Sequence, residues 1–154
     1  TGDAKLYRLD PDLSVHEAFA PVTNSNGIAW SLDGKLVYYI DTPRKEVLAF
    51  DYEDGNLKNL RSVISTAHID ASPDGMTIDA DGNLWITLPL ANRIVVLTPA
   101  GRLVPIIHDP AGLRIDFPTN LCWSGPDMRQ LNVVSRKGGA IVAALTARPG
   151  LRLL

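Results

Sequence analysis

The sequence repeats itself at long range. Residues 26–41 (NGIAWSLDGKLVYYID) align without a gap with residues 74–89 (DGMTIDADGNLWITLP), at a constant offset of 48 residues. A third, looser copy at 119–135 (TNLCWSGPDMRQLNVVS) has a longer turn in place of the Asp-Gly turn. An internal period of this size is typical of repeat architectures, in which each copy is one supersecondary unit. The repeat therefore restricts the fold to a series of similar units.

Each unit is predicted to consist of four antiparallel strands. A first apolar segment, a turn and a second apolar segment (LVYYI or LWITL) are followed by a third segment, at 46–52 or 93–99. Another turn leads to a fourth segment, at 57–64 or 102–108. Alternating hydrophobicity between closely spaced turn residues indicates strands, and no amphipathic helix is predicted. Four antiparallel strands in 45–48 residues are typical of a β-propeller blade.

The predicted fold is therefore all-β, a partial β-propeller with about three blades. We expect residues 1–22 to form the outer strands of a preceding blade, and 23–68 and 69–115 to form complete blades. Residues 116–154 would form a last, incomplete blade. Because propellers usually need four or more blades to close, the open ends would expose strand edges. Such edges favour self-association or pairing with a missing N-terminal half.

Composition restricts the function further. The chain has 154 residues, 45% of them hydrophobic and 21% charged, as in one globular domain. A net charge of −2 gives no electrostatic basis for binding nucleic acid or an anionic membrane, and no apolar run approaches the roughly 20 residues of a membrane span. The single cysteine, Cys122, excludes an internal disulfide, so we predict a cytoplasmic protein. Because Thr1 is not a start methionine and 5–10 already reads as a strand, we expect a fragment or processed piece.

The motifs SNGIAWSLDGKLVYYIDT (25–42), PDGMTIDADGNLWIT (73–87), PTNLCWSGPDMRQLNVVS (118–135) and GGAIVAA (138–144) occur in this order. Together they resemble the regucalcin/gluconolactonase family, also called the senescence-marker-protein family. The resemblance covers nearly the whole chain. It implies the C-terminal half of a six-bladed propeller that binds one divalent cation in its central channel and hydrolyses sugar lactones or related cyclic esters.

The resemblance also implies roles for two residues. Asn26, in Ser-Asn-Gly, corresponds to a metal ligand, and Asp74, in Pro-Asp-Gly, corresponds to a metal ligand that is also the catalytic acid or base. The family's third ligand, a Glu, and the Arg and Asn that bind the sugar have no counterpart here. We therefore expect the chain alone to bind a cation weakly and to turn over a sugar lactone poorly or not at all.

The repeat supports this site independently. Asn26 and Asp74 occupy the same slot in consecutive copies, and equivalent slots on the innermost strands of a propeller surround its axis. Their oxygens should therefore converge. Amide and carboxylate oxygens favour a hard cation, Ca²⁺ first, with Mg²⁺ or Mn²⁺ as alternatives and Zn²⁺ less favoured. The slot of the third copy falls near Thr119 and Asn120, to which no role is assigned.

Structural interpretations of the same residues remain open. Pro-Asp-Gly is common turn chemistry, and Asn26-Gly27 is a type I′ hairpin signal. If both are turns, the chain is a non-catalytic propeller module that binds a ligand or a protein. Asp79, Asp81 and Asn83 imitate the start of a calcium loop, but the Gly and Glu that an EF-hand requires are missing.

The remaining residues of chemical interest are assigned to structure. The histidines show no metal-ligand spacing and are predicted to lie at the surface or in packing contacts. Cys122 is predicted to be a buried, inert thiol, and the tryptophans to pack between blades. Two Asp-Gly pairs are predicted to be hairpin turns, and one basic segment an exposed loop. These residues are His16, His68 and His108; Trp30, Trp85 and Trp123; Asp33-Gly34 and Asp81-Gly82; and Arg136–Gly139.

Overall fold

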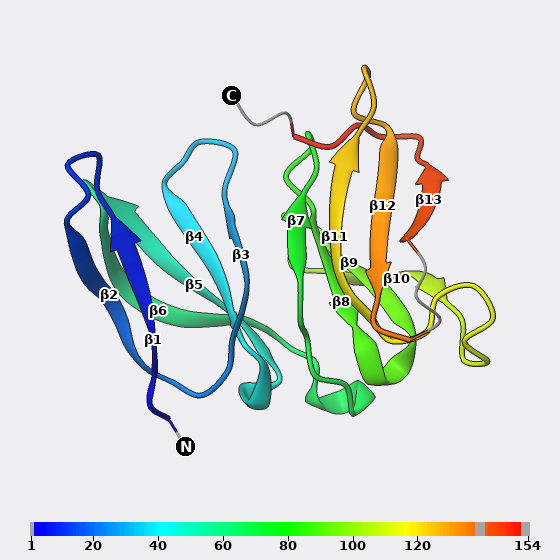
Figure 1. The fold of residues 1–154 in the computed structure, drawn as a ribbon, viewed down its shortest axis with the longest axis horizontal. Coiled ribbons are helices and arrows are strands. Elements are labelled where there is room, and N and C mark those ends of the chain that lie inside the picture. Colours follow the sequence, from blue (N-terminus) through cyan, green and yellow to red (C-terminus); the bar gives the residue numbers. More distant parts are fainter. Residues whose placement is uncertain (1, 138–140, 152–154) are drawn as a thin grey trace.

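The predicted all-β class is confirmed by a computed structural model, which describes residues 2–137 and 141–151 (Figure 1). Strands and three short 3₁₀ turns make up its regular structure, and no α-helix occurs within these two ranges. No helix in them is long and apolar enough to cross a membrane. The strands are β1 Ala4–Leu9, β2 Val15–Val22, β3 Ser25–Trp30, β4 Leu36–Asp41, β5 Glu46–Glu53, β6 Asn56–Ser65, β7 Met76–Ile78, β8 Leu84–Leu88, β9 Arg93–Leu97, β10 Leu103–His108, β11 Pro118–Ser124, β12 Gln130–Ser135 and β13 Ile141–Leu145; the 3₁₀ turns are η1 Thr42–Arg44, η2 Ala67–Ile69 and η3 Pro89–Ala91.

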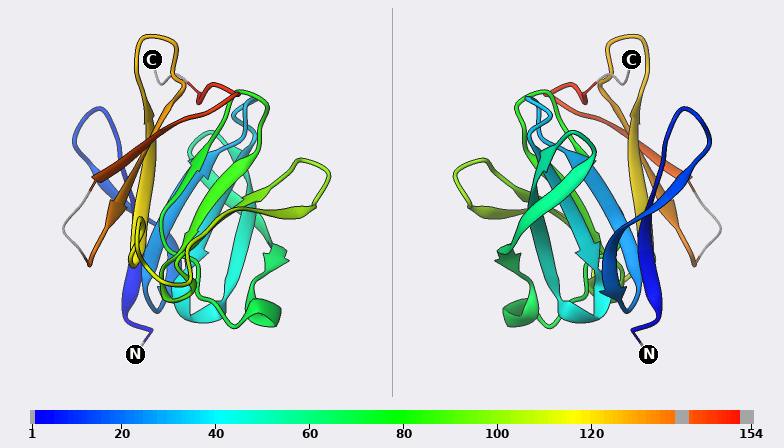
Figure 2. Two further views of the ribbon diagram at one scale, coloured as in Figure 1. Left: turned by 90° about the vertical axis from the view of Figure 1, so that its right-hand side faces the viewer. Right: turned by 90° about the vertical axis from the view of Figure 1, so that its left-hand side faces the viewer.

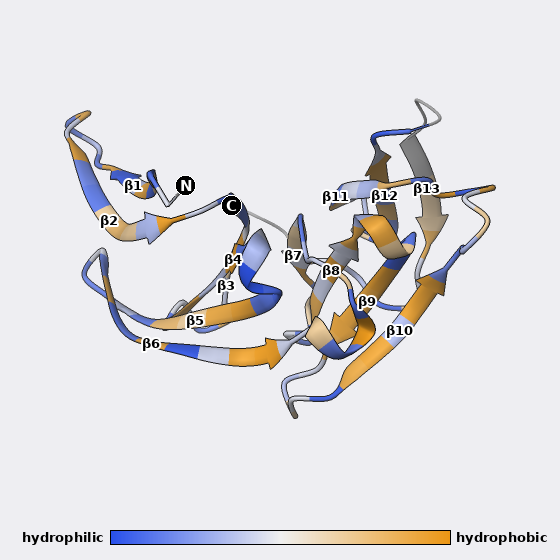
Figure 3. Ribbon diagram, turned by 90° about the horizontal axis from the view of Figure 1, so that it is seen from below, coloured by the Kyte–Doolittle hydropathy of each residue, from blue (hydrophilic) through white to orange (hydrophobic). Residues whose placement is uncertain are grey.

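The strands form four antiparallel sheets, each a simple meander. The sheets are β1-β2, β3-β4-β5-β6, β7-β8-β9-β10 and β11-β12-β13. Viewed from below, the inner strands β3, β7 and β11 lie side by side, and the sheets diverge outward from them (Figure 3). The first residues of the three inner strands therefore lie close together at one end of the molecule.

Three apolar layers join the sheets, because successive residues of the central strands point to opposite faces. In β4, Tyr39 packs towards the β1-β2 hairpin, while Ile40 packs towards the β7–β10 sheet. In β8, Ile86 packs back against the β3–β6 sheet, whereas Trp85 packs against the last sheet. Strands buried on both faces read as continuous apolar runs. This explains why LVYYI and LWITL show little alternation.

The last sheet has a covered and an exposed face. Leu121 and Trp123 of β11 are buried against the β7–β10 sheet, where the Trp123 ring meets that of Trp85 edge-on at 5.2 Å. Cys122 lies between them on the opposite, exposed face. The prediction of a buried thiol was therefore wrong, since it assumed cover on both faces of this strand. Trp30 also differs from expectation: it is 41% exposed and contacts Tyr52.

The segment that follows β13 crosses to the turn between β7 and β8 (Figure 2). The backbone of Gly150 bridges to Asp79 and donates to Met128 O at 2.7 Å. Gly150 lies so close to the Trp123 side chain that no Cβ would fit there. The two Asp-Gly pairs form turns as predicted, with positive φ at Gly34 and Gly82. Of the predicted basic loop, Arg136 and Lys137 are exposed, and Gly138 and Gly139 lie outside the described residues.

Asp79 organises the turn between β7 and β8. It is fully buried, and its carboxylate accepts hydrogen bonds from the backbone N–H groups of Asp81 (3.0 Å) and Asn83 (2.9 Å). It also accepts from the Asn83 side chain (2.8 Å) and from the Trp85 indole (3.0 Å). The acidic cluster that imitates a calcium loop is thus occupied by internal hydrogen bonds.

Replacing Asp79 with Ala is expected to lower the free energy of unfolding by about 3 kcal/mol, because several buried donors lose their acceptor at about 1 kcal/mol or more each. Urea denaturation followed by Trp fluorescence measures the change. The matched control is Asp33→Ala in the equivalent exposed turn, where the loss should stay below about 1 kcal/mol. Equal losses in the two variants would contradict the role of Asp79.

Candidate functional site

Asn26 and Asp74 line one hollow, where the inner strands of three sheets begin. The hollow has a volume of about 350 Å³. Asn26 is the second residue of β3, and Asp74 lies just before β7. Neither residue is assigned to a turn: Asn26 is in the strand, and Asp74 is in a segment without regular secondary structure. The lining residues are Ser25, Asn26, Gly27, Ile28, Asp74, Gly75, Met76, Thr119 and Asn120.

The inner strands approach one another by direct backbone contact. Gly27 N donates to Asp74 O at 2.9 Å, and Gly75 N donates to Thr119 O at the same distance. The repetition of this bond identifies Thr119, rather than Asn120, as the third occupant of the slot of Asn26 and Asp74. A Cβ on Gly27 would lie 2.8 Å from Asp74 O, and one on Gly75 would lie 2.5 Å from Thr119 O. These glycines are therefore needed for close packing.

The amide of Asn26 is held by a hydroxyl that sequence reasoning missed. Asn26 Nδ2 donates to Thr42 Oγ1 at 2.6 Å, and the Thr42 hydroxyl donates to Pro73 O at 2.9 Å. Thr42 opens η1, directly after β4. The preceding residue, Asp41, is 4% exposed, and its carboxylate accepts hydrogen bonds from Thr23 N (3.1 Å) and from the next backbone N–H (2.8 Å). The end of β4 thus fixes the entry of the chain into β3.

Asp74 is held by its backbone, which leaves its carboxylate available. Asp74 N donates to Thr87 O at 3.0 Å, and Gly75 N donates to Thr87 Oγ1 at 2.9 Å. The side chain is half-buried, and burial raises the pKa of the Asp74 carboxyl above its usual value. No hydrogen bond to this carboxylate is found from residues in the described ranges. A carboxylate that has lost water without gaining a donor is stabilised by a nearby cation.

The side-chain donor groups of the described lining are a carboxylate, two amides and two hydroxyls, all of which offer hard oxygen atoms. Neither at this hollow nor elsewhere in the part of the chain that the structure describes do three His, Cys, Asp or Glu side chains gather in a way that could hold a metal ion. His16, His68 and His108 are exposed, in agreement with the sequence prediction. The hollow is the candidate cation site because it combines the Asp74 carboxylate with amide and hydroxyl oxygens.

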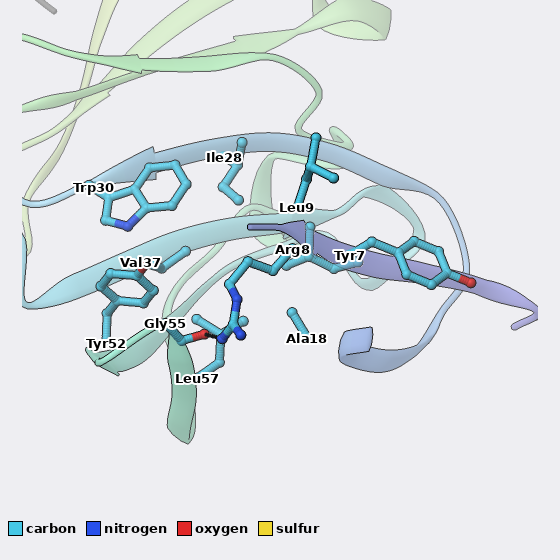
Figure 4. A pocket seen from close by; sticks show the side chains of 11 residues that line it. Tyr7, Arg8, Leu9, Ala18, Ile28, Trp30, Val37, Tyr52, Gly55 and Leu57 are labelled. Carbon is cyan, nitrogen blue, oxygen red and sulfur yellow. Dashed lines mark hydrogen bonds between the residues drawn. The ribbon is translucent and has the colours of Figure 1, made fainter. Parts of the chain in front are cut away.

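A second hollow lies between the β1-β2 hairpin and the next sheet and has a volume of about 330 Å³ (Figure 4). Its lining is mostly apolar and includes Ile28, Trp30 and Tyr52. The one charged lining residue, Arg8, is engaged: its guanidinium donates to both Asp10 carboxylate oxygens and to Gly55 O. Among its described lining residues, this hollow therefore presents no uncommitted charged group.

Comparison with known proteins places the chain in a family. A family model described as SMP-30/gluconolactonase/LRE-like region matches residues 1–137. The chain belongs to this family. Regucalcin from Danio rerio is 39% identical over 150 residues, which cover 96% of this chain and 50% of the relative. Regucalcin from Homo sapiens is 36% identical over 147 residues, which cover 94% and 48%. The chain thus spans about half the length of these relatives, in agreement with the expected half of a family member.

Solved structures of SMP-30/gluconolactonase-like proteins resemble the chain in fold. A luciferin-regenerating enzyme superposes with a TM-score of 0.81 at 25% identity, and the match covers 96% of this chain and 53% of that enzyme. A gluconolactonase from Xanthomonas campestris gives a TM-score of 0.70 at 28% identity, and the match covers 85% of this chain and 41% of that protein. A calcium-binding regucalcin from Agrobacterium tumefaciens gives 0.82 at 21% identity, over 99% and 57%; at this identity the likeness concerns the fold alone.

Proposed function

We propose that the complete gene product hydrolyses a sugar lactone and that residues 1–154 contribute Asn26 and Asp74 to its cation site. The observation that carries the proposal is the hollow lined by both residues, where the Asp74 carboxylate is half-buried without a hydrogen-bond donor from the described chain. Family membership supports a lactonase-type hydrolase in general. We further propose that the four sheets belong to a six-bladed ring, as two complete blades between two incomplete ones, with boundaries at 22/23, 68/69 and 115/116.

The donor set fits a hard divalent cation. Asn26 Oδ1 and the Asp74 carboxylate would hold it, with Ca²⁺ as the first candidate and Mg²⁺, Mn²⁺ or Zn²⁺ as alternatives. Bound there, the cation would supply Lewis-acid polarisation of the lactone carbonyl. Because Ca²⁺ takes about six to eight oxygen ligands, two side chains leave most positions to water or to residues beyond this chain. We therefore expect weak binding and poor turnover by residues 1–154 alone.

Asp74 is the proposed general base. Its carboxylate lines the same hollow as the proposed cation and accepts no hydrogen bond from the described residues, so it is free to accept a proton. In the hollow, Asp74 would accept a proton from a water molecule that attacks the lactone carbonyl, and would return it to the ring oxygen as the ring opens. The bond from the carbonyl carbon to the ring oxygen breaks, and the products are a carboxylic acid and a hydroxyl.

The test is gluconolactone hydrolysis by the complete gene product, followed by alkali consumption at constant pH after correction for spontaneous opening. We expect turnover to require added Ca²⁺ or Mn²⁺ and to fall on the order of 100-fold or more in Asp74→Ala, as for the loss of a general base. Asp33→Ala, at an exposed turn, is the matched control and should retain full activity. Cation-independent turnover, or turnover unaffected by Asp74→Ala, would refute the proposal.

A further inference from the structure

The geometry points to Thr42 as a positioning residue of the candidate cation site: its hydroxyl sets which end of the Asn26 amide faces the hollow. This inference rests on the proposed function, since it assumes that Asn26 Oδ1 is a ligand. Thr42 is not among the residues that line the hollow. It would act only through Asn26, without touching cation or substrate.

The orientation follows from counting donors. A threonine hydroxyl has one hydrogen to donate and lone pairs that accept. Pro73 O is a carbonyl oxygen and can only accept, so the 2.9 Å bond between Thr42 Oγ1 and Pro73 O uses the hydroxyl hydrogen. The 2.6 Å contact between Thr42 Oγ1 and Asn26 must then be donated by the amide nitrogen. The amide oxygen is thereby turned away from Thr42.

Thr42 is held in place by hydrogen bonds of its own backbone and of the preceding residue, Asp41. Its backbone N–H donates to Asn24 O at 3.1 Å. The neighbouring carboxylate of Asp41, 4% exposed, accepts from Thr23 N and Asn24 N. The hydroxyl therefore has a defined position between the proposed ligands, because it joins the Asn26 side chain to the carbonyl that immediately precedes Asp74.

The second repeat explains why only one such hydroxyl is needed. The two ends of an amide differ chemically, whereas the two oxygens of a carboxylate are equivalent. Asp74 thus needs no partner to select its ligating atom. The element that corresponds to η1 in this repeat is η3, which opens with Pro89 rather than with a hydroxyl residue. The contact to the next inner strand is made instead by Thr87, whose Oγ1 lies 3.2 Å from both Thr119 O and Gly75 O, so that these two carbonyls share its one hydrogen.

The experiment compares Ca²⁺ affinity of the complete gene product by isothermal titration calorimetry. Thr42→Val removes the hydroxyl at nearly constant shape, and Thr42→Ser retains it. We expect Thr42→Val to weaken binding about 10-fold or more, in the range found when a group that orients a metal ligand is lost, and Thr42→Ser to remain within about 2-fold. Thermal unfolding in EDTA measures any loss of fold for each variant separately.

A double-mutant cycle separates positioning from a general packing effect. In an Asn26→Asp background either carboxylate oxygen can ligate, so Thr42→Val should change affinity by less than about 2-fold there. An equal loss in both backgrounds, or no loss with Asn26 present, overturns the inference. If Asn26→Ala and Asp74→Asn both bind Ca²⁺ as the wild type does, the proposed site itself fails. If these two variants lose binding while Thr42→Val does not, only the positioning role fails.

Discussion

Replacing Asp74 with Asn is expected to stabilise the cation-free protein at neutral pH while abolishing its stabilisation by Ca²⁺. Burial raises the folded-state pKa of Asp74 above its unfolded value of about 3.9. Between these two values the native state binds more protons than the unfolded state, so the free energy of unfolding falls as the pH rises through this window. Above the window the ionised carboxylate destabilises the fold, and a neutral Asn removes that cost.

Differential scanning calorimetry in EDTA and in excess Ca²⁺ measures both effects. With Ca²⁺ at 100 times its Kd, the wild type should gain about 2.7 kcal/mol, and Asp74→Asn should gain almost nothing. Asp33→Asn is the control, and we expect it to lower rather than raise the free energy of unfolding at neutral pH. Hydrogen bonds from the Ser31 hydroxyl and the Lys35 backbone N–H lower the pKa of Asp33. The stability that Asp33 contributes is present above its unfolded pKa and is lost as the pH falls through its folded pKa. A cation-free Asp74→Asn protein less stable than wild type at pH 7 would contradict the assignment.

Gly75→Ala is expected to lower the free energy of unfolding by about 3 kcal/mol and to abolish cation binding. The φ angle of Gly75 is not in the left-handed region, so Ala carries no backbone strain there. Its Cβ, however, would lie 2.5 Å from Thr119 O and 2.6 Å from Asn120 Cα. Because backbone atoms cannot rotate aside, β7 must move away from β11, and overpacking of this kind costs about 1–3 kcal/mol or more. Guanidinium denaturation and calorimetric Ca²⁺ titration measure the two losses.

Gly101→Ala is the matched control for Gly75→Ala. Gly101 has a φ of +76°, and a Cβ added to it would meet no atom within 4 Å, so its substitution tests backbone strain without a clash. We expect a cost of about 1 kcal/mol and unchanged Ca²⁺ affinity. If Gly75→Ala proved as mild as Gly101→Ala, the close approach of β7 and β11 would not be a constraint on the site.

The sequence predicted local structure well, because turns and strands depend on neighbouring residues. The segments LVYYI and LWITL lie within β4 and β8 as expected, and the Asp-Gly pairs form turns. The placement of Asn26 and Asp74 in one hollow could also be inferred, since the repeat puts them in one slot. Burial in the last sheet could not be predicted, because it depends on which faces are covered. Cys122 shows this, being exposed between two buried neighbours.

Contacts between distant side chains were also beyond prediction. Thr42 is 16 residues from Asn26, and a Thr-Pro pair after a strand reads as the start of a turn. Asp79 was considered only as part of a calcium loop, although it is an internal acceptor. Thr119 and Asn120 could not be distinguished until the bond from Gly75 N was known, because the third copy has a different loop length. The repeats did contain one signal for such a partner: the first copy has Asn26 where the second has Asp74. The oxygen of an amide, unlike that of a carboxylate, needs a partner to orient it.

The two proposed ligands belong to different sheets, which are joined at this point by the bond from Gly27 N to Asp74 O. Any motion that parts β3 from β7 would also pull the ligands away from a shared ion. Bound calcium would then resist such opening, because its ligands would come from both sheets. Protease cleavage of the connecting segment 66–75, which requires local separation, should accordingly slow as calcium is added.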